Sequence, residues 1–443
     1  MHASNPEATG AAAFERSTIA VLLISLGLGL ATQRLGLWVG GFPLAFSLLV
    51  MVGSLTLLGA QGALRIHWGR ASAYYLVLAT VTASALLNID EASFPSYLLL
   101  LGLYAPLCLQ TELSPERYRG YYAGVIWIAA ALAVGGVAQY LLQFVVGNPE
   151  LLFSWASFVP ENLLIEYATL NKLSYESATL KSNGVVFLEA SAFSQFLARA
   201  VLLALIVSVQ RRWIPLLGIA LLLTYSGTGM LVLAAFLPFA LLSRRTWRGL
   251  NPRKAAPLFG LAVLAALASA AALSALGVFD LSLLLSRFDE VSAPGSSGYA
   301  RYGSTPLILS QAFRVQSPLQ LLFGLGPGAT DQFLTGYSFE VFATAWVKLL
   351  VEYGLLGLVS VSAFLAVCLW TSTRSRVLSG AFLVQFLLLD GNLLVPQYVL
   401  LLMFLGALPT VGAALARPAV EARRPGPPAT MPQSTELALL AER

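Results

Sequence analysis

The sequence predicts an all-α polytopic membrane protein, and three observations lead to that class. The chain has 443 residues, of which 58% are hydrophobic and 11% are charged, whereas soluble proteins carry about 25% charged residues. Apolar runs near the ~20 residues that cross a bilayer as a helix recur along the whole chain. Arginine gathers in alternate connections between these runs, as the positive-inside rule describes.

Twelve apolar runs are predicted to be membrane spans. They cover about 17–33, 38–60, 71–88, 94–110, 121–146, 184–209, 213–226, 228–243, 255–276, 342–370, 377–393 and 396–416. Residues 1–416 then form one transmembrane domain with two long outer loops, at 147–183 and 277–341. The segment 417–443 is rich in Pro, Ala and Arg, which favours a disordered tail.

Basic residues orient the predicted spans. With both termini in the cytoplasm, 18 of the 26 Lys and Arg residues fall in inner segments, six fall in outer loops and two fall within spans. The net charge of +5 therefore reflects membrane sidedness, and no nucleic-acid partner is expected. A multi-pass plasma membrane protein follows from this distribution.

Histidine and cysteine are too scarce for a metal centre. The chain holds two of each, namely His2, His67, Cys108 and Cys368, and no spacing among them is typical of a zinc site. Both cysteines are expected near cytoplasmic ends of spans, where a disulfide is disfavoured. We expect neither a metal nor a cofactor.

The outer loops are long enough to be functional rather than plain connectors. In the first, Pro160 is predicted to start a short helix. In the second, Ser304 is predicted to start a helix with Leu309, Ala312 and Phe313 on one face. The glycine-rich run 324–328 lacks the ending of a nucleotide-binding loop and is predicted to be a turn.

Glu189 is the first candidate catalytic residue. It is placed about six residues into the sixth predicted span, roughly 9 Å deep, where an acid is costly and is by default a functional candidate. The alternative is a structural acid bonded to a neighbouring helix. Arg199, ten residues later, lies on a different face of the helix and is interpreted as a structural residue.

Arg301 is the second candidate catalytic residue, in the sequence SGYARYGS. Arginine recognises phosphate through a planar fork of donors, and Arg287 and Arg314 add two further guanidinium groups to the same outer loop. A pyrophosphate at the membrane surface would suit this set. The alternative is an ordinary solvated charge at each position.

Three further residues are predicted to bind substrate. Ser226 and Thr228 belong to a Ser-Gly-Thr-Gly turn between two spans, which either offers hydroxyls to an anion or sugar or only lets the helices approach closely. Asp390 lies near the outer end of the eleventh predicted span and could face the same cavity. Lys348 and Glu352 are four residues apart, which predicts an ion pair on the helix surface.

The order of these motifs resembles the O-antigen polymerase and ligase superfamily over about 184–360. The motifs are FLEASAFSQFLARAVLLALI, YSGTGML, SGYARYGS with LLFGLGPG, and VKLLVEYGLLGL. The resemblance implies a GT-C-type membrane glycosyltransferase that works without a metal ion. It also implies that Arg301, which matches the family's arginine ahead of the loop helix, contacts pyrophosphate. Thr344-Ala345-Trp346 stands where the ligases carry a histidine, and the second ligase arginine is not apparent, so the chain looks more like the polymerase branch.

We therefore expect a polymerase of a bacterial surface polysaccharide at the periplasmic face of the inner membrane. Its substrate would be an undecaprenyl-pyrophosphate-linked oligosaccharide, and its partners would include membrane lipid, a chain-length regulator and export machinery. Glu189 would take the proton of the acceptor hydroxyl, and the arginines would stabilise the leaving pyrophosphate. The alternatives are an O-antigen ligase acting on lipid A core and a polysaccharide or lipid transporter.

Overall fold

The computed structural model describes most of the chain. Its described residues are 6–39, 42–153, 158–165, 172–173, 178–243, 246–247, 296, 298–334, 341–389 and 393–412. The ninth predicted span, the tail at 417–443, and the candidate residues Arg287 and Asp390 lie outside these residues.

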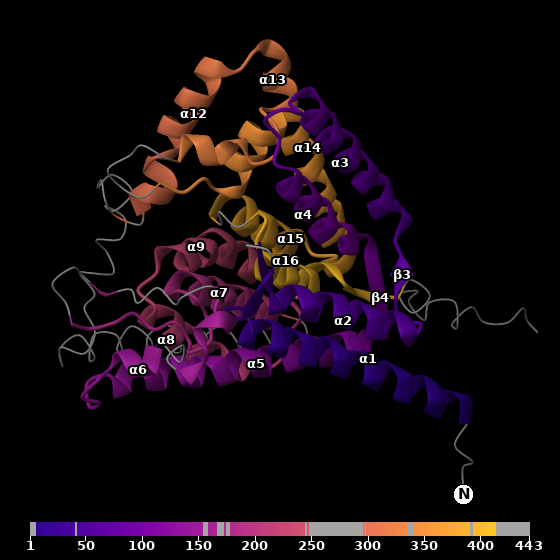
Figure 1. Ribbon diagram of the computed structural model, residues 1–443. Coiled ribbons are helices and arrows are strands. Elements are labelled where there is room, and N and C mark those ends of the chain that lie inside the picture. The colour runs from indigo at the N-terminus through magenta and orange to yellow at the C-terminus, as the bar shows by residue number, and fades with distance from the viewer. Residues whose placement is uncertain are drawn as a thin grey trace, which may run out of the picture.

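The described chain is mostly helical, as predicted (Figure 1). Its helices are α1 (Pro6–Ala31), α2 (Phe46–Ala60), α3 (Trp68–Leu87), α4 (Phe94–Tyr104), α5 (Pro115–Leu142), α6 (Glu150–Phe153), α7 (Ala190–Ile206), α8 (Ile214–Leu223), α9 (Gly227–Leu242), α12 (Thr305–Val315), α13 (Pro318–Phe323), α14 (Ala345–Thr373), α15 (Arg376–Val384) and α16 (Pro396–Leu402). Short 3-10 or π segments follow three of them: η1 (Ala105–Cys108) after α4, η8 (Gln385–Leu389) after α15 and η9 (Met403–Ala407) after α16.

Among the described residues, four helical stretches are long and apolar enough to cross a membrane: Ala13–Ala31 in α1, and the whole of α3, α5 and α14. Shorter apolar helices accompany them at Phe46–Ala60, Phe94–Cys108, Ala190–Ile206, Gly227–Leu242, Arg376–Leu389 and Pro396–Ala407. Large apolar side chains point outward, among them Ile24 of α1 at 62% exposure and Val359 of α14 at 56%. Lipid covers such surfaces at low cost, whereas water does not. The chain is a helical, membrane-embedded protein.

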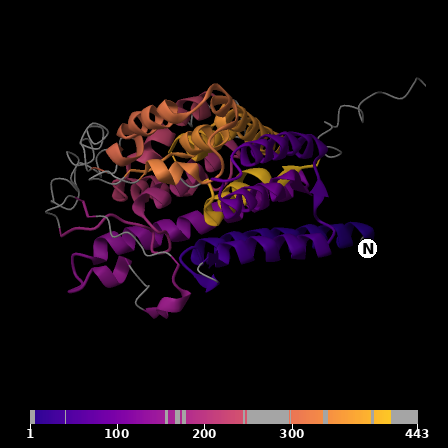
Figure 2. The same cartoon turned by 45° about the horizontal axis from the view of Figure 1, so that its top comes forward.

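Helix α7 lies at the centre of one group of helices. All 17 of its residues are buried, and α5, α8, α9 and α15 pack around it. A helix whose residues are mostly apolar is expected to be enclosed in this way. Figure 2 shows α1 and α5 together along the lower side of the molecule. Glu189 directly precedes α7, so its side chain lies at the N-terminus of this enclosed helix.

Helices α3 and α14 form the second group and run antiparallel. Near one end, the Ser84 hydroxyl donates to the Glu352 carbonyl oxygen at 2.8 Å. In the middle, the hydroxyls of Thr80 and Ser360 are 2.8 Å apart and buried. Such interhelical hydroxyl bonds are typical of packed membrane helices.

Arg70 ties four elements together at the other end of this pair. Its side chain is fully buried and donates five hydrogen bonds, to Thr371 Oγ1 (2.8 Å), Ser372 Oγ (2.6 Å) and the carbonyl oxygens of Leu107 (3.2 Å), Leu109 (2.9 Å) and Ala407 (2.8 Å). A buried guanidinium is tolerated when its donors are satisfied. The sequence reading did not foresee this role.

Two small sheets were not predicted either. Strand β1 (Gly36–Val39) pairs antiparallel with β2 (Phe42–Ala45), so the second predicted span begins at Phe46 rather than at residue 38. Strands β3 (Arg65–Ile66), β4 (Leu109–Leu113) and β5 (Pro409–Val411) form a sheet in which β4 lies between the other two. Strand β5 is parallel to β4, which joins the end of the described chain to an early connection.

The loop helices are partly as predicted. Helix α12 begins after Ser304, as expected, but it buries Ile308 and Ala312 while Phe313 is 45% exposed. In the first loop, the predicted helix is a single 3-10 turn, η3 (Glu161–Leu163).

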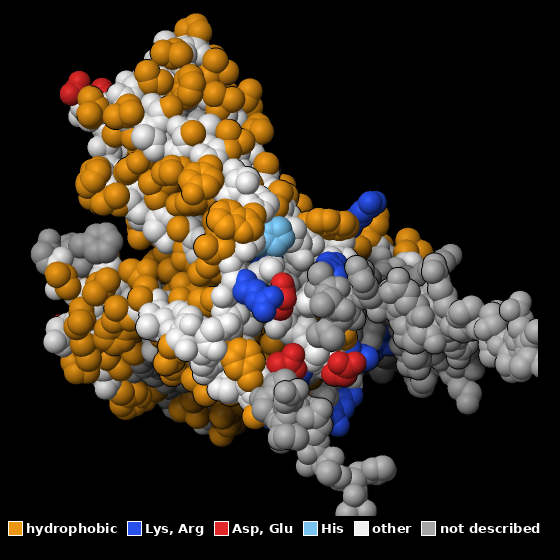
Figure 3. Space-filling view, turned by 90° about the vertical axis from the view of Figure 1, so that its right-hand side faces the viewer, with side chains coloured by type: hydrophobic (Ala, Val, Ile, Leu, Met, Phe, Trp, Pro, Cys, Tyr) orange, Lys and Arg blue, Asp and Glu red, His pale blue; other side chains and the backbone are white. Residues whose placement is uncertain are grey.

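Charged side chains gather at one end of the molecule, which Figure 3 views face on. Ion pairs join Arg65 to Glu112 at 3.1 Å and Arg117 to Glu15 at 3.6 Å. We call the part of the molecule that holds these four residues the charged end. Helix α1 leads from Glu15 to Ala31, roughly 24 Å away at 1.5 Å per residue, and Arg34 follows three residues later. We call the Arg34 side of the molecule the far end.

Candidate functional site

The two predicted catalytic residues meet, although 112 positions separate them in sequence. Nη2 of Arg301 donates to both carboxylate oxygens of Glu189, at 2.9 and 3.0 Å. The side chains are 22% and 24% exposed, respectively. Hydrogen bonds between ionised partners are about twice as strong as neutral ones. The far end therefore presents a joined acid and base that solvent and a substrate can reach.

Glu189 lies at the start of its helix rather than within it. The prediction placed it six residues into a span over 184–209, but α7 begins at Ala190 and Glu189 is its N-cap residue. Gly184 and Val185 precede it with φ of +66° and +70°, which no right-handed helix accommodates. The carboxylate thus lies at a helix N-terminus, where the peptide dipoles favour negative charge.

Arg301 is held by a short π segment, η6 (Tyr299–Gly303), that runs into α12. The amide of Phe342 donates to the Ala300 carbonyl oxygen at 2.9 Å, and the Ser304 hydroxyl donates to the same oxygen at 2.6 Å. Ala300 is 4% exposed. The backbone beside Arg301 is therefore anchored from two elements, which leaves its side chain directed at α7.

A run of hydroxyl groups connects the ion pair to the Ser-Gly-Thr-Gly turn. The Ser191 hydroxyl donates to Oε1 of Glu189, and the Ser194 hydroxyl donates to the Ser191 carbonyl oxygen at 2.7 Å. Ser194 Oγ lies 3.4 Å from Thr228 Oγ1, which lies 3.0 Å from Ser226 Oγ. Ser191 and Ser194, which the sequence analysis did not predict, thus link four predicted site residues: Glu189, Arg301, Ser226 and Thr228.

Those two serines carried a weak signal. Ser191 and Ser194 are small polar residues three apart in a largely apolar helix, so they lie on one face, and small residues are common where helices pack closely. Such a pattern indicates a partner helix without saying which one. The structure supplies the partner, α9.

Gly229 lets α9 approach α7 at this point. Its amide donates to Ser194 Oγ at 3.2 Å, and a Cβ there would lie 2.4 Å from the Ser194 carbonyl oxygen. The close-packing interpretation of the turn is therefore confirmed. Ser226 and Thr228 are 9% and 7% exposed, and the Thr228 hydroxyl lies between those of Ser194 and Ser226; direct contact of either with a sugar or anion stays a prediction.

Arg314, the second described arginine of this loop, does not join the site. Arg314 is exposed in the last turn of α12, whereas Arg301 lies before its first turn. The 11 residues of α12 separate these positions by roughly 15 Å. The prediction that Arg314 shares one site with Arg301 is not supported by this arrangement, because a rigid helix stands between them.

The glycine-rich run 324–328 turns the chain, as predicted. The turn packs against a break in α14. Gly354 interrupts that helix with φ of +65°. The amides of Leu325 and Gly326 donate to the carbonyl oxygens of Val351 and Glu352, at 2.9 and 3.0 Å. The loop thereby satisfies the carbonyl groups that the break releases from the helix ladder.

Glu352 does not behave as predicted. Among the described residues, no ion pair joins it to Lys348, although the two are one turn apart on α14. The Glu352 side chain is 2% exposed and faces the amide of Gly328 and the hydroxyl of Thr330. The loop packed on the helix break draws the carboxyl inward, so the predicted surface ion pair is wrong.

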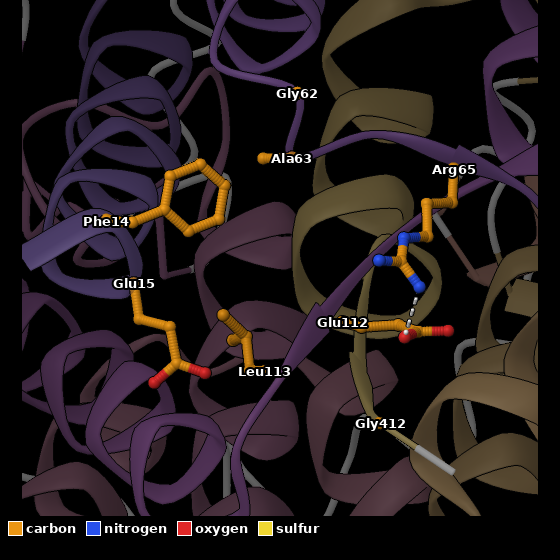
Figure 4. A pocket seen from close by; sticks show the side chains of 8 residues that line it. All are labelled: Phe14, Glu15, Gly62, Ala63, Arg65, Glu112, Leu113 and Gly412. Atoms are coloured by element: carbon orange, nitrogen blue, oxygen red, sulfur yellow. Dashed lines mark hydrogen bonds and ion pairs between the residues drawn. The ribbon is translucent and has the colours of Figure 1, made fainter. Parts of the chain in front are cut away.

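A surface pocket of about 170 Å³ opens at the charged end (Figure 4). It is lined by Phe14, Glu15, Gly62, Ala63, Arg65, Glu112, Leu113 and Gly412. Its charged groups are held in the ion pairs described above. Since α1 spans the distance between the two ends, this pocket is separate from the Glu189–Arg301 pair.

Within the described part of the chain, no three His, Cys, Asp or Glu side chains gather as metal ligands would. Comparison with protein-family models, with curated proteins and with solved structures found no match to this chain. The chemistry of the site residues is therefore the basis for any assignment of function.

Proposed function

We propose that this chain is a membrane glycosyltransferase that polymerises a bacterial surface polysaccharide at the periplasmic face of the inner membrane. It would transfer an undecaprenyl-pyrophosphate-linked glycan to the acceptor repeat unit. The observation that carries the proposal is the ion pair of Glu189 and Arg301 at the far end. Glycosyl transfer from a pyrophosphate lipid needs a base for the acceptor hydroxyl and a cation for the leaving group, and this pair supplies one of each.

The pairing suggests how the site would be switched on by its substrate. In the structure, Arg301 is engaged by the Glu189 carboxylate. An incoming pyrophosphate carries more negative charge and would compete for the guanidinium. The released carboxylate could then accept the hydroxyl proton, while Ser191 keeps it oriented through its own hydrogen bond. The acceptor oxygen would bond to the anomeric carbon as the sugar–pyrophosphate bond breaks. Departure of undecaprenyl pyrophosphate, and loss of the proton from Glu189 to solvent, would restore the resting pair.

The proposal includes the membrane arrangement. It has about twelve spans in a GT-C-type architecture, both termini in the cytoplasm, and the Glu189–Arg301 site outside. Two observations support this sidedness. The charged end holds the start of α1 and strand β5, which lies near the end of the described chain, and positive charge favours the cytoplasm. The chain-length regulator and export machinery would be partners of such an enzyme.

Two alternatives remain distinguishable. An O-antigen ligase would use the same chemistry with lipid A core as the acceptor. A polysaccharide or lipid transporter is favoured by one observation, the break of α14 at Gly354 beside the buried Glu352, because broken helices and buried acids occur at transport sites. Transport would not require the Glu189–Arg301 pair to act as base and phosphate ligand.

The test uses the full-length protein in proteoliposomes with an undecaprenyl-pyrophosphate-linked oligosaccharide. Release of undecaprenyl pyrophosphate and growth of the glycan ladder are followed together for the wild type, Arg301→Ala and Glu189→Gln. Loss of one preorganised charge at such a site costs roughly 3 kcal/mol, about 100-fold in rate. Arg314→Ala is the matched control, since it removes an arginine from the same loop, in the last turn of α12.

Release with a growing ladder, lost in both site variants and kept in Arg314→Ala, supports the polymerase. Release only after lipid A core is added identifies the ligase. Movement of labelled lipid between leaflets without release identifies the transporter and refutes the enzyme.

A further inference from the structure

We propose that Arg34 is a positioning residue that, with Gln139 and Gln143, holds the segment 180–189 so that Glu189 faces Arg301. The inference deepens the proposed function and rests on it. None of these three residues was singled out by the sequence, and all come from helices or connections other than α7. They bind the segment that leads to Glu189, not the substrate.

The segment 180–189 needs outside partners because it is not helical. Its amides and carbonyl groups lie beside apolar helices, where unpaired backbone groups cost several kcal/mol each. Ser182 and Asn183 are 0% and 2% exposed, so water does not serve them. The hydrogen bonds therefore come from neighbouring protein groups: the Leu223 carbonyl oxygen accepts from the Ser182 amide at 3.2 Å, and side chains serve Leu180, Asn183 and Phe187.

Helix α5 provides two of the anchors through glutamines one turn apart. Gln143 Oε1 accepts from the Leu180 amide at 2.7 Å, and its Nε2 donates to the Leu180 carbonyl oxygen at 3.2 Å. Gln139 Oε1 accepts from the Asn183 amide at 3.1 Å, and its Nε2 donates to Asn183 Oδ1 at 2.7 Å. Each glutamine thus grips one residue of the segment from both sides.

The backbone just beyond these anchors is strained. Val185 has φ of +70°, which is rare for a β-branched residue and persists only where the surroundings impose it. Asn183 Oδ1 accepts from the Val185 amide at 3.1 Å, and the Gly184 position lies against the Phe193 ring, 2.6 Å from where a Cβ would be. Strain of this kind is concentrated at functional sites.

Arg34 supplies the last anchor. It binds Phe187, two residues before Glu189. Its side chain is fully buried at the end of α1, and Nη2 donates to the Phe187 carbonyl oxygen. Burial lowers the pKa of Arg34 to about 10, so the guanidinium is charged at neutral pH. The Phe187 ring packs on those of Phe193 and Phe196, with centroids 5.2 and 5.4 Å apart.

A residue that is fully buried cannot bind the glycan or the pyrophosphate directly. Arg34 would act on the reaction through the Phe187 carbonyl oxygen and the chain that follows it. Without that bond, residues 186–189 would lose their fixed direction and the Glu189 carboxylate would sample other positions. Misplacement of a catalytic group by ~1 Å can cost about 100-fold in rate.

The test combines hydrogen–deuterium exchange with the transfer assay for the wild type, Arg34→Gln and Arg34→Lys in proteoliposomes. For Arg34→Gln we expect faster exchange confined to 184–189, at least tenfold lower kcat and KM within twofold. Arg34→Lys keeps a donor and should recover part of both. Arg65→Gln, which removes an exposed arginine at the charged end, should change neither.

Exchange and kcat that match the wild type in Arg34→Gln would overturn the inference. So would faster exchange across the whole protein, since that shows a general structural role. If the wild type transfers no glycan, the proposed function fails. Exchange confined to 184–189 would still support Arg34 as the residue that positions Glu189.

Discussion

A methyl group at position 229 would separate α9 from α7. The Cβ of Gly229→Ala would lie 2.4 Å from the Ser194 carbonyl oxygen and 2.5 Å from its carbonyl carbon, whereas non-bonded carbon atoms rest about 3.5–4.0 Å apart. Since both obstacles are backbone atoms, α9 would have to move by roughly 1 Å. Overpacking costs about 1–3 kcal/mol, and loss of the Gly229–Ser194 hydrogen bond adds about 1 kcal/mol.

Gly227→Ala is the matched control for this prediction. It lies two residues earlier in the same helical turn, and no atom lies within 4 Å of its would-be Cβ. Both variants are purified in detergent and unfolded by heat. At roughly 2–4 °C per kcal/mol, Gly229→Ala should lower the Tm by several degrees, while Gly227→Ala should leave it unchanged or raise it.

The same displacement would carry Thr228 away from Ser194. We therefore expect Gly229→Ala to weaken glycan transfer as well as stability. If Gly229→Ala and Gly227→Ala unfold at the same temperature, α9 does not pack on α7 at Ser194. The hydroxyl run from Glu189 to Ser226 would then be refuted along with it.

Three further predictions concern stability. Gly354→Ala forces a methyl group to within 2.4 Å of the Leu322 carbonyl in a left-handed conformation, so we expect a loss of about 3 kcal/mol; Gly53→Ala, which meets open space, should be neutral, and equal thermal shifts would contradict this. Arg70→Met removes five hydrogen bonds, three of them to carbonyl oxygens, and should cost about 4 kcal/mol, with Arg70→Lys less harmful; a wild-type Tm for the Met variant would disprove the role of Arg70. His67 accepts from the Arg70 amide, and its burial, then the charge of Arg70, lower its pKa below the ordinary 6.5. The unfolded chain therefore takes up this proton first, so stability should be full above pH 6.5 and decline as the pH falls below it; His67→Asn should flatten that part of the profile in thermal unfolding measured against pH.

Composition and periodicity predicted the helices that span the apolar runs, and they located the start of α12 at Ser304. They failed at the edges of elements. The second and sixth spans begin later than predicted, because β1 and β2 pair at residues 36–45 and because Gly184 and Val185 adopt left-handed conformations. Hydropathy measures what a segment can bury and carries little information on where its backbone changes direction.

The candidate site was predicted as separate residues rather than as a site. Glu189 and Arg301 were chosen because a charge near the membrane is costly and an arginine fork suits phosphate. Nothing in the sequence joins them, since 112 residues lie between them. Arg34 was overlooked because a single arginine after a span is an ordinary feature of membrane proteins.

The sequence by itself determined that this chain is a helical membrane protein, because apolar length and the distribution of charge are properties of consecutive residues. Tertiary structure alone decided that Glu189 meets Arg301, that Gly229 lets α9 pack closely on α7, and that Arg34 holds the chain ahead of Glu189. These are contacts between segments distant along the chain. They depend on packing and on the need of every buried backbone group for a partner, which no local pattern records.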